Sequence, residues 1–308
     1  MRIMTRRESL AAGAAAATAA GIGSAAAEAG DARAEVGAQV PFTRVQAAGR
    51  EIAVTRRGKG RPVLCLHAAG HGARDFEPLA ERVGDACEII AIDFPGHGRS
   101  PADGKPVRVG GYAQVVTDVI DALKLDRPVL LGNSLGGGAA IAVAAQAPEK
   151  TSGLVLCDPS GLIPPTPATE AAVKPMIGMF NLGVAGSPEF EPAFANYYRN
   201  VVLPAPAAAP QRERIIASGR GIAPLLADAW TGFLEPASYL GELVPSVTTP
   251  TWLAWARNDR LVAWDYCKAQ ATRLPKHTLD FFEGGHSPFL EDPDNFTAGL
   301  KKFLADLD

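Results

Sequence analysis

The chain has 308 residues, of which 47% are hydrophobic and 20% are charged. It can therefore bury a full core, and it exceeds the length that one compact domain usually needs. Its 30 Lys and Arg residues are balanced by 33 Asp and Glu residues, and no long run of one charge follows the first few residues. This balance gives no indication of a nucleic acid or of a partner held by charge. We therefore expect one large domain with an insertion, and a small molecule as its ligand.

The first 34 residues differ in composition from the rest of the chain. Arg6 and Arg7 precede a weakly apolar run of Ala and Gly at residues 11–23, which is the layout of a secretory signal. The run resembles a twin-arginine signal, and small-residue sites that could be cleaved follow it. We predict that residues 1–34 are a twin-arginine signal peptide and that the mature protein is periplasmic or secreted. The alternative is an Ala-rich tail with no targeting role.

No later segment approaches the apolar length that a bilayer requires, so we expect no stable membrane insertion of the mature chain. The cysteines show no close spacing of the kind that holds zinc; they are Cys65, Cys87, Cys157 and Cys267. Cys65 and Cys157 lie in apolar runs that predict central strands, where a buried thiol is the usual state. We expect no essential disulfide, no metal and no organic cofactor.

From residue 42 onward, short apolar runs alternate with helical patterns, which is typical of a mostly parallel sheet covered on both faces. The segments at residues 42–46 and 51–56 flank Ala48-Gly49 and predict an opening hairpin. Six further strands are expected at residues 62–67, 88–93, 128–132, 153–158, 251–256 and 278–282. Helices are expected at residues 76–83, 112–123, 135–147 and 293–307. The sequence thus predicts an α/β fold.

Residues 159–245 interrupt this alternation. They are rich in Pro, Ala and Gly and carry several aromatic residues, among them Phe180, Phe190, Phe194, Tyr197, Tyr198, Trp230 and Phe233. The strand pattern resumes near residue 251. We therefore predict an inserted lid at residues 159–245 and a core formed by residues 40–158 and 246–308.

The most specific motif is Gly132-Asn133-Ser134-Leu135-Gly136, a Gly-x-Ser-x-Gly pattern directly after a predicted strand and directly before a predicted helix. A nucleophile at such a sharp turn adopts a strained backbone, and the flanking glycines let neighbouring backbone approach. The alternative is a Gly-rich turn that packs closely or grips a phosphate, but the phosphate-loop pattern is absent. Ser134 is the candidate nucleophile.

A serine hydroxyl needs a base within hydrogen-bond reach, and the base needs a third group that fixes its tautomer. His286 lies in a Gly-rich loop just after the last apolar strand, and Asp259 follows the preceding strand. Together with Ser134 they give the chain order Ser, Asp, His. Asp265 is the nearest rival for the acid and is expected to start a helix.

The remaining polar residues at strand ends are assigned structural roles. Asp93 and Asp158 lie on the wrong side of the chain order for the acid, and Asp93 is expected to support the turn that follows it. Structural hydrogen bonds are expected for four histidines, with His71 a candidate for the border of the pocket; they are His67, His71, His97 and His277.

Acyl transfer also needs donors for a developing oxyanion, and loss of one donor typically costs about 10²- to 10³-fold in rate. We expect the backbone amides of Leu135, directly after the nucleophile, and Ala69, in the loop after an early strand, to supply them. A merely tight turn around Ala69 is the alternative.

Taken together, these segments resemble the α/β-hydrolase superfamily over everything after the leader. The segments are His67-Ala68-Ala69-Gly70, Asp93-Phe94-Pro95-Gly96-His97-Gly98, Gly132-Asn133-Ser134-Leu135-Gly136-Gly137, Asn258-Asp259 and Gly285-His286-Ser287-Pro288. The resemblance implies an eight-stranded, mostly parallel sheet with helices on both faces, a catalytic triad at its carboxyl end and a helical lid inserted after strand 6. Ala68 replaces the Gly that usually follows the loop histidine.

The haloalkane dehalogenase and epoxide hydrolase branches attack their substrates through a carboxylate, whereas this chain has a serine at position 134. The resemblance therefore implies a serine hydrolase that cleaves a carboxylic ester of a mainly apolar small molecule through an acyl-enzyme. The elbow around Ser134 is also similar to that of hydrolases that cleave carbon-carbon bonds in ring-fission products, although Ser287 stands where that branch usually has Trp. A ligand-binding protein of this fold with little turnover is a further alternative. Substrate identity, lid motion and oligomeric state stay open.

Overall fold

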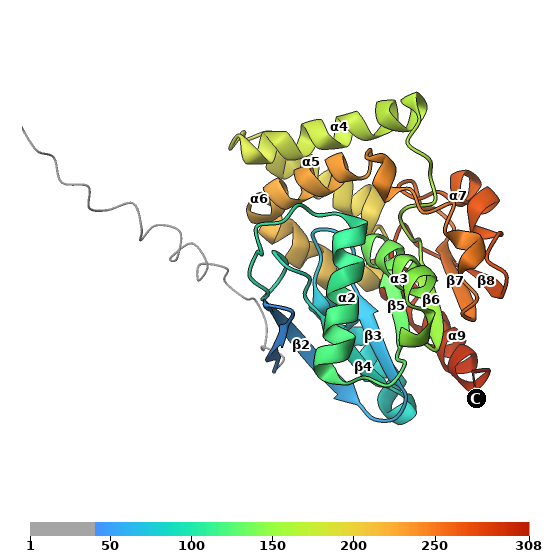
Figure 1. The fold of residues 1–308 in the computed structure, drawn as a ribbon. Coiled ribbons are helices and arrows are strands. Elements are labelled where there is room, and N and C mark those ends of the chain that lie inside the picture. The colour runs from blue at the N-terminus through green and yellow to red at the C-terminus, as the bar shows by residue number, and fades with distance from the viewer. Residues whose placement is uncertain (1–40, 308) are drawn as a thin grey trace, which may run out of the picture. The chain divides into compact units, whose positions relative to one another are not determined.

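The structure is a computed structural model that describes residues 41–307. The predicted signal peptide, residues 1–34, lies outside the described residues. Residues 41–307 form one eight-stranded sheet in the order β1-β2-β4-β3-β5-β6-β7-β8 (Figure 1). The strands are β1 (Thr43–Ala47), β2 (Arg50–Gly58), β3 (Pro62–Leu66), β4 (Glu88–Ile92), β5 (Val129–Asn133), β6 (Gly153–Cys157), β7 (Thr251–Ala256) and β8 (His277–Phe282).

Strand direction divides the sheet into two parts. β1 pairs antiparallel with β2, and β2 pairs antiparallel with β4. All pairs from β4 through β3 and on to β8 are parallel. The prediction of a mostly parallel eight-stranded sheet is therefore confirmed.

The central strands are buried along their whole length. Every residue of β5, β6 and β7 is buried, because a parallel sheet is covered by helices on both faces. For the same reason these strands are continuous apolar runs in the sequence rather than alternating ones. Successive side chains point to opposite faces, so Leu64 and Leu66 belong to one core and Val63 and Cys65 to the other.

Helices cover both faces of the sheet. One face packs against α2 (Val109–Leu123), α3 (Leu135–Gln146) and α7 (Trp264–Ala271). The other face packs against α1 (Glu77–Val83), α8 (Pro288–Glu291) and α9 (Pro293–Ala305). Among the helices of residues 41–307, none combines the length and the apolar character that a membrane span requires.

The segment between β6 and β7 contains three longer helices, α4 (Pro167–Val184), α5 (Phe190–Tyr197) and α6 (Ala209–Gly232), and a π-helical turn, η5 (Tyr198–Val202). Figure 1 shows α4, α5 and α6 together at one end of the sheet. Their aromatic side chains pack against one another, with the rings of Phe190 and Phe194 stacked 5.0 Å apart. These side chains are continuous with the core on the face of the sheet that α1, α8 and α9 cover.

Ion pairs tie α6 and the turn after it to the loop before α2. Arg108 Nη1 lies 3.0 Å from Asp228 Oδ1, and its Nε donates to Glu235 Oε2 at 2.7 Å. The amide of Val107 donates to Asp228 Oδ2 at 2.6 Å. These contacts hold the carboxyl end of α6 against the core.

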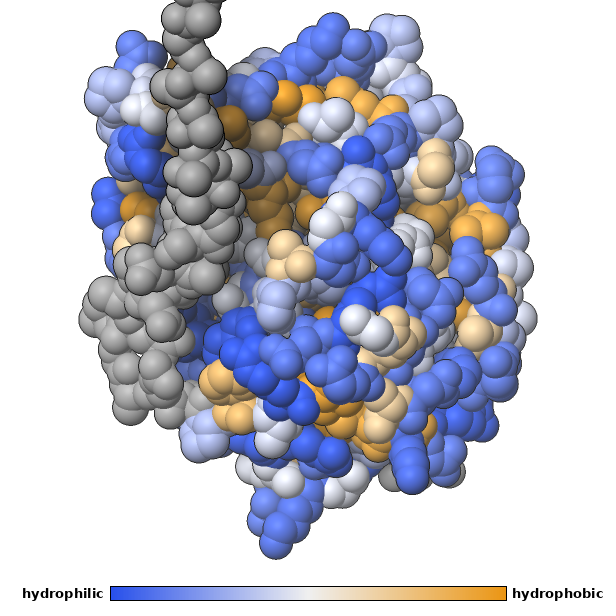
Figure 2. All heavy atoms as spheres, turned by 60° about the vertical axis from the view of Figure 1, so that its left-hand side comes forward, coloured by the Kyte–Doolittle hydropathy of each residue, from blue (hydrophilic) through white to orange (hydrophobic). Residues whose placement is uncertain are grey.

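The apolar residues are largely withdrawn from the surface. Among the large hydrophobic residues of the range 41–307, Val184 and Tyr266 are the exposed ones, with 53% and 72% of their surface accessible. On the face drawn in Figure 2, hydrophilic residues predominate and hydrophobic ones occur in separate groups.

Candidate active site

Ser134 occupies the sharp turn between β5 and α3. Its backbone has φ 50° and ψ −113°, a conformation that L-residues rarely adopt and that costs on the order of 1–3 kcal/mol. The turn requires both flanking glycines. A Cβ on Gly132 would lie 2.4 Å from the carbonyl oxygen of Gly136, and a Cβ on Gly136 would lie 2.2 Å from the carbonyl oxygen of Leu66.

His286 and Asp259 form a buried hydrogen-bonded pair. His286 Nδ1 lies 2.8 Å from Asp259 Oδ2, and the two residues are 3% and 6% exposed. The second oxygen of Asp259 accepts the amides of Leu261 at 2.6 Å and Val262 at 3.0 Å. Burial by itself would raise the pKa of Asp259, but the neighbouring imidazole and these hydrogen bonds lower it. Asp259 is therefore ionised, and Nδ1 of His286 carries the shared hydrogen.

Asp158, at the end of β6, contributes a second carboxyl group beside Asp259. It is fully buried, and its Oδ1 accepts the amide of Ala256 at 3.0 Å. Its Oδ2 meets no donor. Burial raises the pKa of Asp158 well above its ordinary value, and the charge of Asp259 raises it further. Asp158 is therefore the neutral member of the pair.

The loop that carries His286 is held by Glu291, one turn further along the chain. Glu291 Oε2 accepts the amides of three consecutive residues, Gly285 at 2.9 Å, His286 at 2.8 Å and Ser287 at 3.0 Å. Its Oε1 accepts the amide of Ala205, which belongs to the inserted segment between β6 and β7, at 3.3 Å. Burial raises the pKa of Glu291, and the four amides oppose that shift. Sequence reasoning missed this residue.

Asn133 joins the turn of Ser134 to the loop of His286. Its Nδ2 donates to the carbonyl of Cys157 at 3.1 Å and to that of His286 at 2.9 Å. Its Oδ1 accepts the hydroxyl of Ser287 at 2.8 Å. All of these groups are buried. Ser287 therefore has a structural partner at the position where the carbon-carbon hydrolases usually carry Trp.

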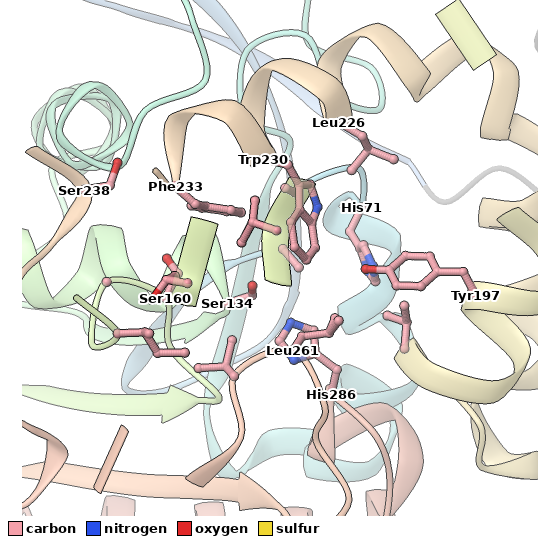
Figure 3. A pocket seen from close by; sticks show the side chains of 18 of the residues that line it. His71, Ser134, Ser160, Tyr197, Leu226, Trp230, Phe233, Ser238, Leu261 and His286 are labelled. Carbon is pink, nitrogen blue, oxygen red and sulfur yellow. The ribbon is translucent and has the colours of Figure 1, made fainter. Parts of the chain in front are cut away.

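A cavity of about 100 Å³ opens between this site and the inserted segment (Figure 3). Figure 3 shows the side chains of Ser134 and His286 directed into it. Its walls are largely apolar, with a few polar groups among them. The apolar residues include Leu226, Trp230, Phe233, Ile163 and Leu261, and the polar ones include His71, Ser160, Tyr197, Tyr198 and Ser238.

The two residues whose amides are predicted to donate to the oxyanion, Ala69 and Leu135, both lie near Ser134. Ala69 lines the cavity. Leu135 is the first residue of α3, and the amides of a helix's first turn have no partner within the helix. Gly70 is required beside Ala69, because its φ is +76° and a Cβ would lie 2.7 Å from Leu226 Cδ2 of α6.

The other histidines divide into two groups. His67 accepts the amide of Phe94 through Nε2 at 3.0 Å, and burial lowers its pKa to about 4. His97 contacts the carbonyl of Pro95, and His277 that of Leu274. His71 differs, since it lines the cavity and pairs with Asp75.

The remaining acidic residues discussed from the sequence lie outside the cavity. Asp93 accepts the amide of Ala73 at 2.6 Å and both the amide and Nε of Arg99, at 3.1 Å and 3.0 Å. It thereby ties the loop of Ala69 to the turn after β4. Asp265 lies in the first turn of α7, largely exposed, and pairs with Lys268.

Within residues 41–307, no three His, Cys, Asp or Glu side chains are grouped so as to hold a metal ion. The four cysteines are buried free thiols.

A family model described as the alpha/beta hydrolase family matches residues 63–298. Since this match covers most of the chain, the protein belongs to the α/β hydrolase family. Over 268 residues it is 26% identical to a 2-hydroxy-6-oxononadienedioate/2-hydroxy-6-oxononatrienedioate hydrolase of a Pseudomonas species, covering 82% of this chain and 92% of that protein. Over 258 residues it is 28% identical to a pimeloyl-[acyl-carrier protein] methyl ester esterase of Stenotrophomonas maltophilia, covering 81% and 95%.

Solved structures show the same fold. An esterase from Exiguobacterium antarcticum superimposes with a TM-score of 0.73 at 21% identity, covering 86% of this chain and all of that one.

Proposed function

We propose that the protein is a serine hydrolase that cleaves a carboxylic ester of a small, mainly apolar molecule through an acyl-enzyme. The observation that carries the proposal is the buried His286–Asp259 pair, which opens on the same cavity as Ser134 at its strained turn. A serine needs such a pair because its hydroxyl is a poor nucleophile at neutral pH. Membership of the family supports the hydrolase class.

In the first half-reaction Ser134 Oγ attacks the carbonyl carbon of the ester. Because Nδ1 of His286 is held by Asp259, Nε2 is the nitrogen that accepts the hydroxyl proton. The carbonyl oxygen becomes an oxyanion, which the amides of Ala69 and Leu135 stabilise. Collapse of the tetrahedral intermediate breaks the bond to the alcohol oxygen, and His286 gives its proton to the departing alcohol.

In the second half-reaction water attacks the acyl-enzyme. His286 Nε2 accepts a proton from the water, a second tetrahedral intermediate forms, and the same proton returns to Ser134 Oγ as the acid leaves. Asp259 stays ionised throughout and stabilises the imidazolium that forms in both steps. Glu291 and Asn133 keep the loop of His286 in place during the cycle.

The size and lining of the cavity support a short, mainly apolar acyl group. A volume of about 100 Å³ holds a few carbon atoms beside the reacting carbonyl. Leu226, Trp230 and Phe233 from the inserted segment supply apolar contacts.

The test is hydrolysis of p-nitrophenyl esters of increasing acyl length by the full chain and by Ser134→Ala. We expect the rate to be highest for short acyl groups and kcat to fall by at least about 10⁴-fold in Ser134→Ala. The matched control is Ser246→Ala, an exposed serine of η8 (Val244–Ser246), which should keep full activity. Hydrolysis that survives in Ser134→Ala would contradict the proposal.

A second candidate is hydrolysis of a carbon-carbon bond, which the likeness to the 2-hydroxy-6-oxononadienedioate hydrolase favours. The same nucleophile and base would serve. The two candidates separate on substrate: a protein that leaves every p-nitrophenyl ester intact and cleaves a ring-fission-type diketone would favour the second. Retention of either compound without turnover would favour a binding protein.

A further inference from the structure

A second His–Asp pair faces the cavity of Ser134. His71 Nδ1 lies 2.5 Å from Asp75 Oδ2, and the two side chains are 2% and 3% exposed. His71 lines the same cavity as Ser134 and His286 (Figure 3), and its ring lies 5.8 Å from that of Tyr198. The mechanism above uses neither residue. A buried imidazole held by a buried carboxylate therefore opens on the substrate space without an assigned role.

The local backbone fixes this pair. His71 follows Gly70 in the loop after β3, and its amide donates to the carbonyl of Ala68 at 3.1 Å. Asp75 lies in the short helix η2 (Ala73–Phe76), four residues further on. Because Asp75 holds Nδ1, Nε2 is the ring nitrogen that is left for a ligand in the cavity.

The charged groups next to the His71 side chain are Asp75 and, beyond it, Arg214. Asp75 is ionised: burial would raise its pKa, but His71 and Arg214 outweigh burial and lower it. Arg214 of α6 lies 3.7 Å from the other oxygen of Asp75 and balances its charge. A proton on His71 therefore leaves the group of three with one net positive charge, which an anionic ligand would neutralise.

The titratable or charged groups that surround His71 are Asp75, Arg214, Tyr197, Tyr198, His67 and His286. Burial raises the pKa of Tyr197 and of Tyr198, so both phenols stay neutral. Burial lowers the pKa of His67 to about 4 and that of His97 behind it still further, so neither adds a positive charge at neutral pH. The residues that line the cavity in the described part of the chain include no Lys or Arg.

We infer that His71, positioned by Asp75, binds a carboxylate group of the substrate, so that the preferred substrates are short esters that carry a free carboxylate on the acyl side. The inference rests on the proposed ester hydrolysis and names its substrate class. Nε2 of the imidazolium donates a hydrogen bond to the carboxylate, while Ser134 attacks the ester carbonyl in the same cavity.

The test compares two esters of equal shape, ethyl hydrogen succinate and ethyl 4-methylpentanoate, in which an isopropyl group replaces the carboxylate. The full chain should prefer the carboxylate ester by about 10- to 100-fold in kcat/KM, the equivalent of one charged hydrogen bond.

Three variants separate binding from structure. His71→Gln should lose the preference and should still hydrolyse ethyl 4-methylpentanoate. Asp75→Asn should weaken the preference, because the carboxylate that positions His71 through Nδ1 is gone. The matched control is His277→Gln, in which the replaced imidazole contacts the carbonyl of Leu274 outside the cavity; it should behave as the unchanged chain.

Calorimetry keeps the test decisive if a His71 variant does not fold. The Ser134→Ala protein, which retains His71, should bind ethyl hydrogen succinate about 10- to 100-fold more tightly than ethyl 4-methylpentanoate. Equal kcat/KM for both esters, or binding of the carboxylate ester no tighter than that of its isopropyl counterpart, would overturn the inference and leave the ester hydrolysis standing. Failure to cleave either ester, with the binding preference intact, would instead count against ester hydrolysis alone.

Discussion

Three buried carboxyl groups lie around His286 and its loop, and each is stabilised in a different way. Asp259 is ionised beside an imidazole, and Glu291 accepts four backbone amides. Asp158 has one amide and a neighbouring carboxylate, and it keeps its proton. Because an isolated ion is costly to bury, the environment of each carboxyl group decides its charge.

The protonation of Asp158 predicts a pH-dependent gain in stability for Asp158→Asn. In the unfolded chain the carboxyl group of Asp158 loses its proton above a pKa of about 3.9, whereas in the folded protein it keeps that proton to a higher pH. The free energy of unfolding of the wild type therefore falls as the pH rises from about 3.9 towards the raised pKa of folded Asp158. The slope is up to about 1.4 kcal/mol per pH unit. Asn keeps the acceptor for the amide of Ala256 and is neutral without needing that proton. Urea unfolding at several pH values measures the difference.

Two results would bear on this prediction. The exposed substitution Asp306→Asn should run parallel to wild type at every pH, because it removes no buried carboxyl group. A constant difference between Asp158→Asn and wild type across the pH range would mean that Asp158 is ionised in the folded protein.

At the scale of secondary structure, the inserted segment depends on small residues where α4 crosses α6. Gly183 of α4 faces Ala223 of α6 and the ring of Phe190. A Cβ there would lie 2.6 Å from Ala223 Cβ. Gly178 lies in the same helix with nothing within 4 Å of a Cβ. The two glycines therefore lie in the same helix but differ in how closely neighbouring atoms pack around them.

We predict opposite effects for alanine at these two positions. Gly183→Ala should lower the free energy of unfolding by about 1–2 kcal/mol, because overpacking outweighs the gain in helix propensity. Gly178→Ala should raise it by about 0.5–1 kcal/mol, because alanine reduces the backbone entropy lost on folding. Denaturant unfolding of both variants checks the pair. Stabilisation by both substitutions would show that α4 can move away from α6 at little cost.

The fold was predictable where secondary structure leaves a strong pattern. β5, β6 and β7 are buried on both faces, so their apolar runs marked them to within one or two residues of their observed bounds. The helices between β6 and β7 were not located in advance. Pro175 and Pro224 lie inside α4 and α6, and such residues hide a helical pattern.

The candidate site was predictable only in part, for a related reason. Ser134 has a local motif, and His286 and Asp259 follow strand ends in a recognisable order. Glu291 acts on backbone amides, which leave no trace in residue identity. Asp158 was set aside on chain order, but the carboxyl ends of parallel strands share one edge, so it lies beside Asp259. The His71–Asp75 pair depends on a short helix that the sequence did not indicate.

At the scale of the whole molecule, we propose that the chain is exported by its twin-arginine segment, residues 1–34. Replacing Arg6 and Arg7 together by Lys should retain the full-length protein in the cytoplasm, because paired arginines are the defining feature of such signals. Fractionation of expressing bacteria, followed by immunoblotting, measures the change. The same replacement at Arg56 and Arg57 of β2 is the control. Export that survives the Arg6 and Arg7 replacement would contradict the proposal.

The burial of the four thiols has a consequence for how the protein would lose activity outside the cytoplasm. All four cysteines have no exposed surface, and burial raises the pKa of each, that of Cys87 to about 11. Thiolate is the reactive form, so the native state resists oxidation. Unfolding would release four reactive thiols at once, and cross-linking would then prevent refolding. In an oxidising medium, the time for which the protein stays active is therefore set by the rate at which it unfolds rather than by its equilibrium free energy of unfolding.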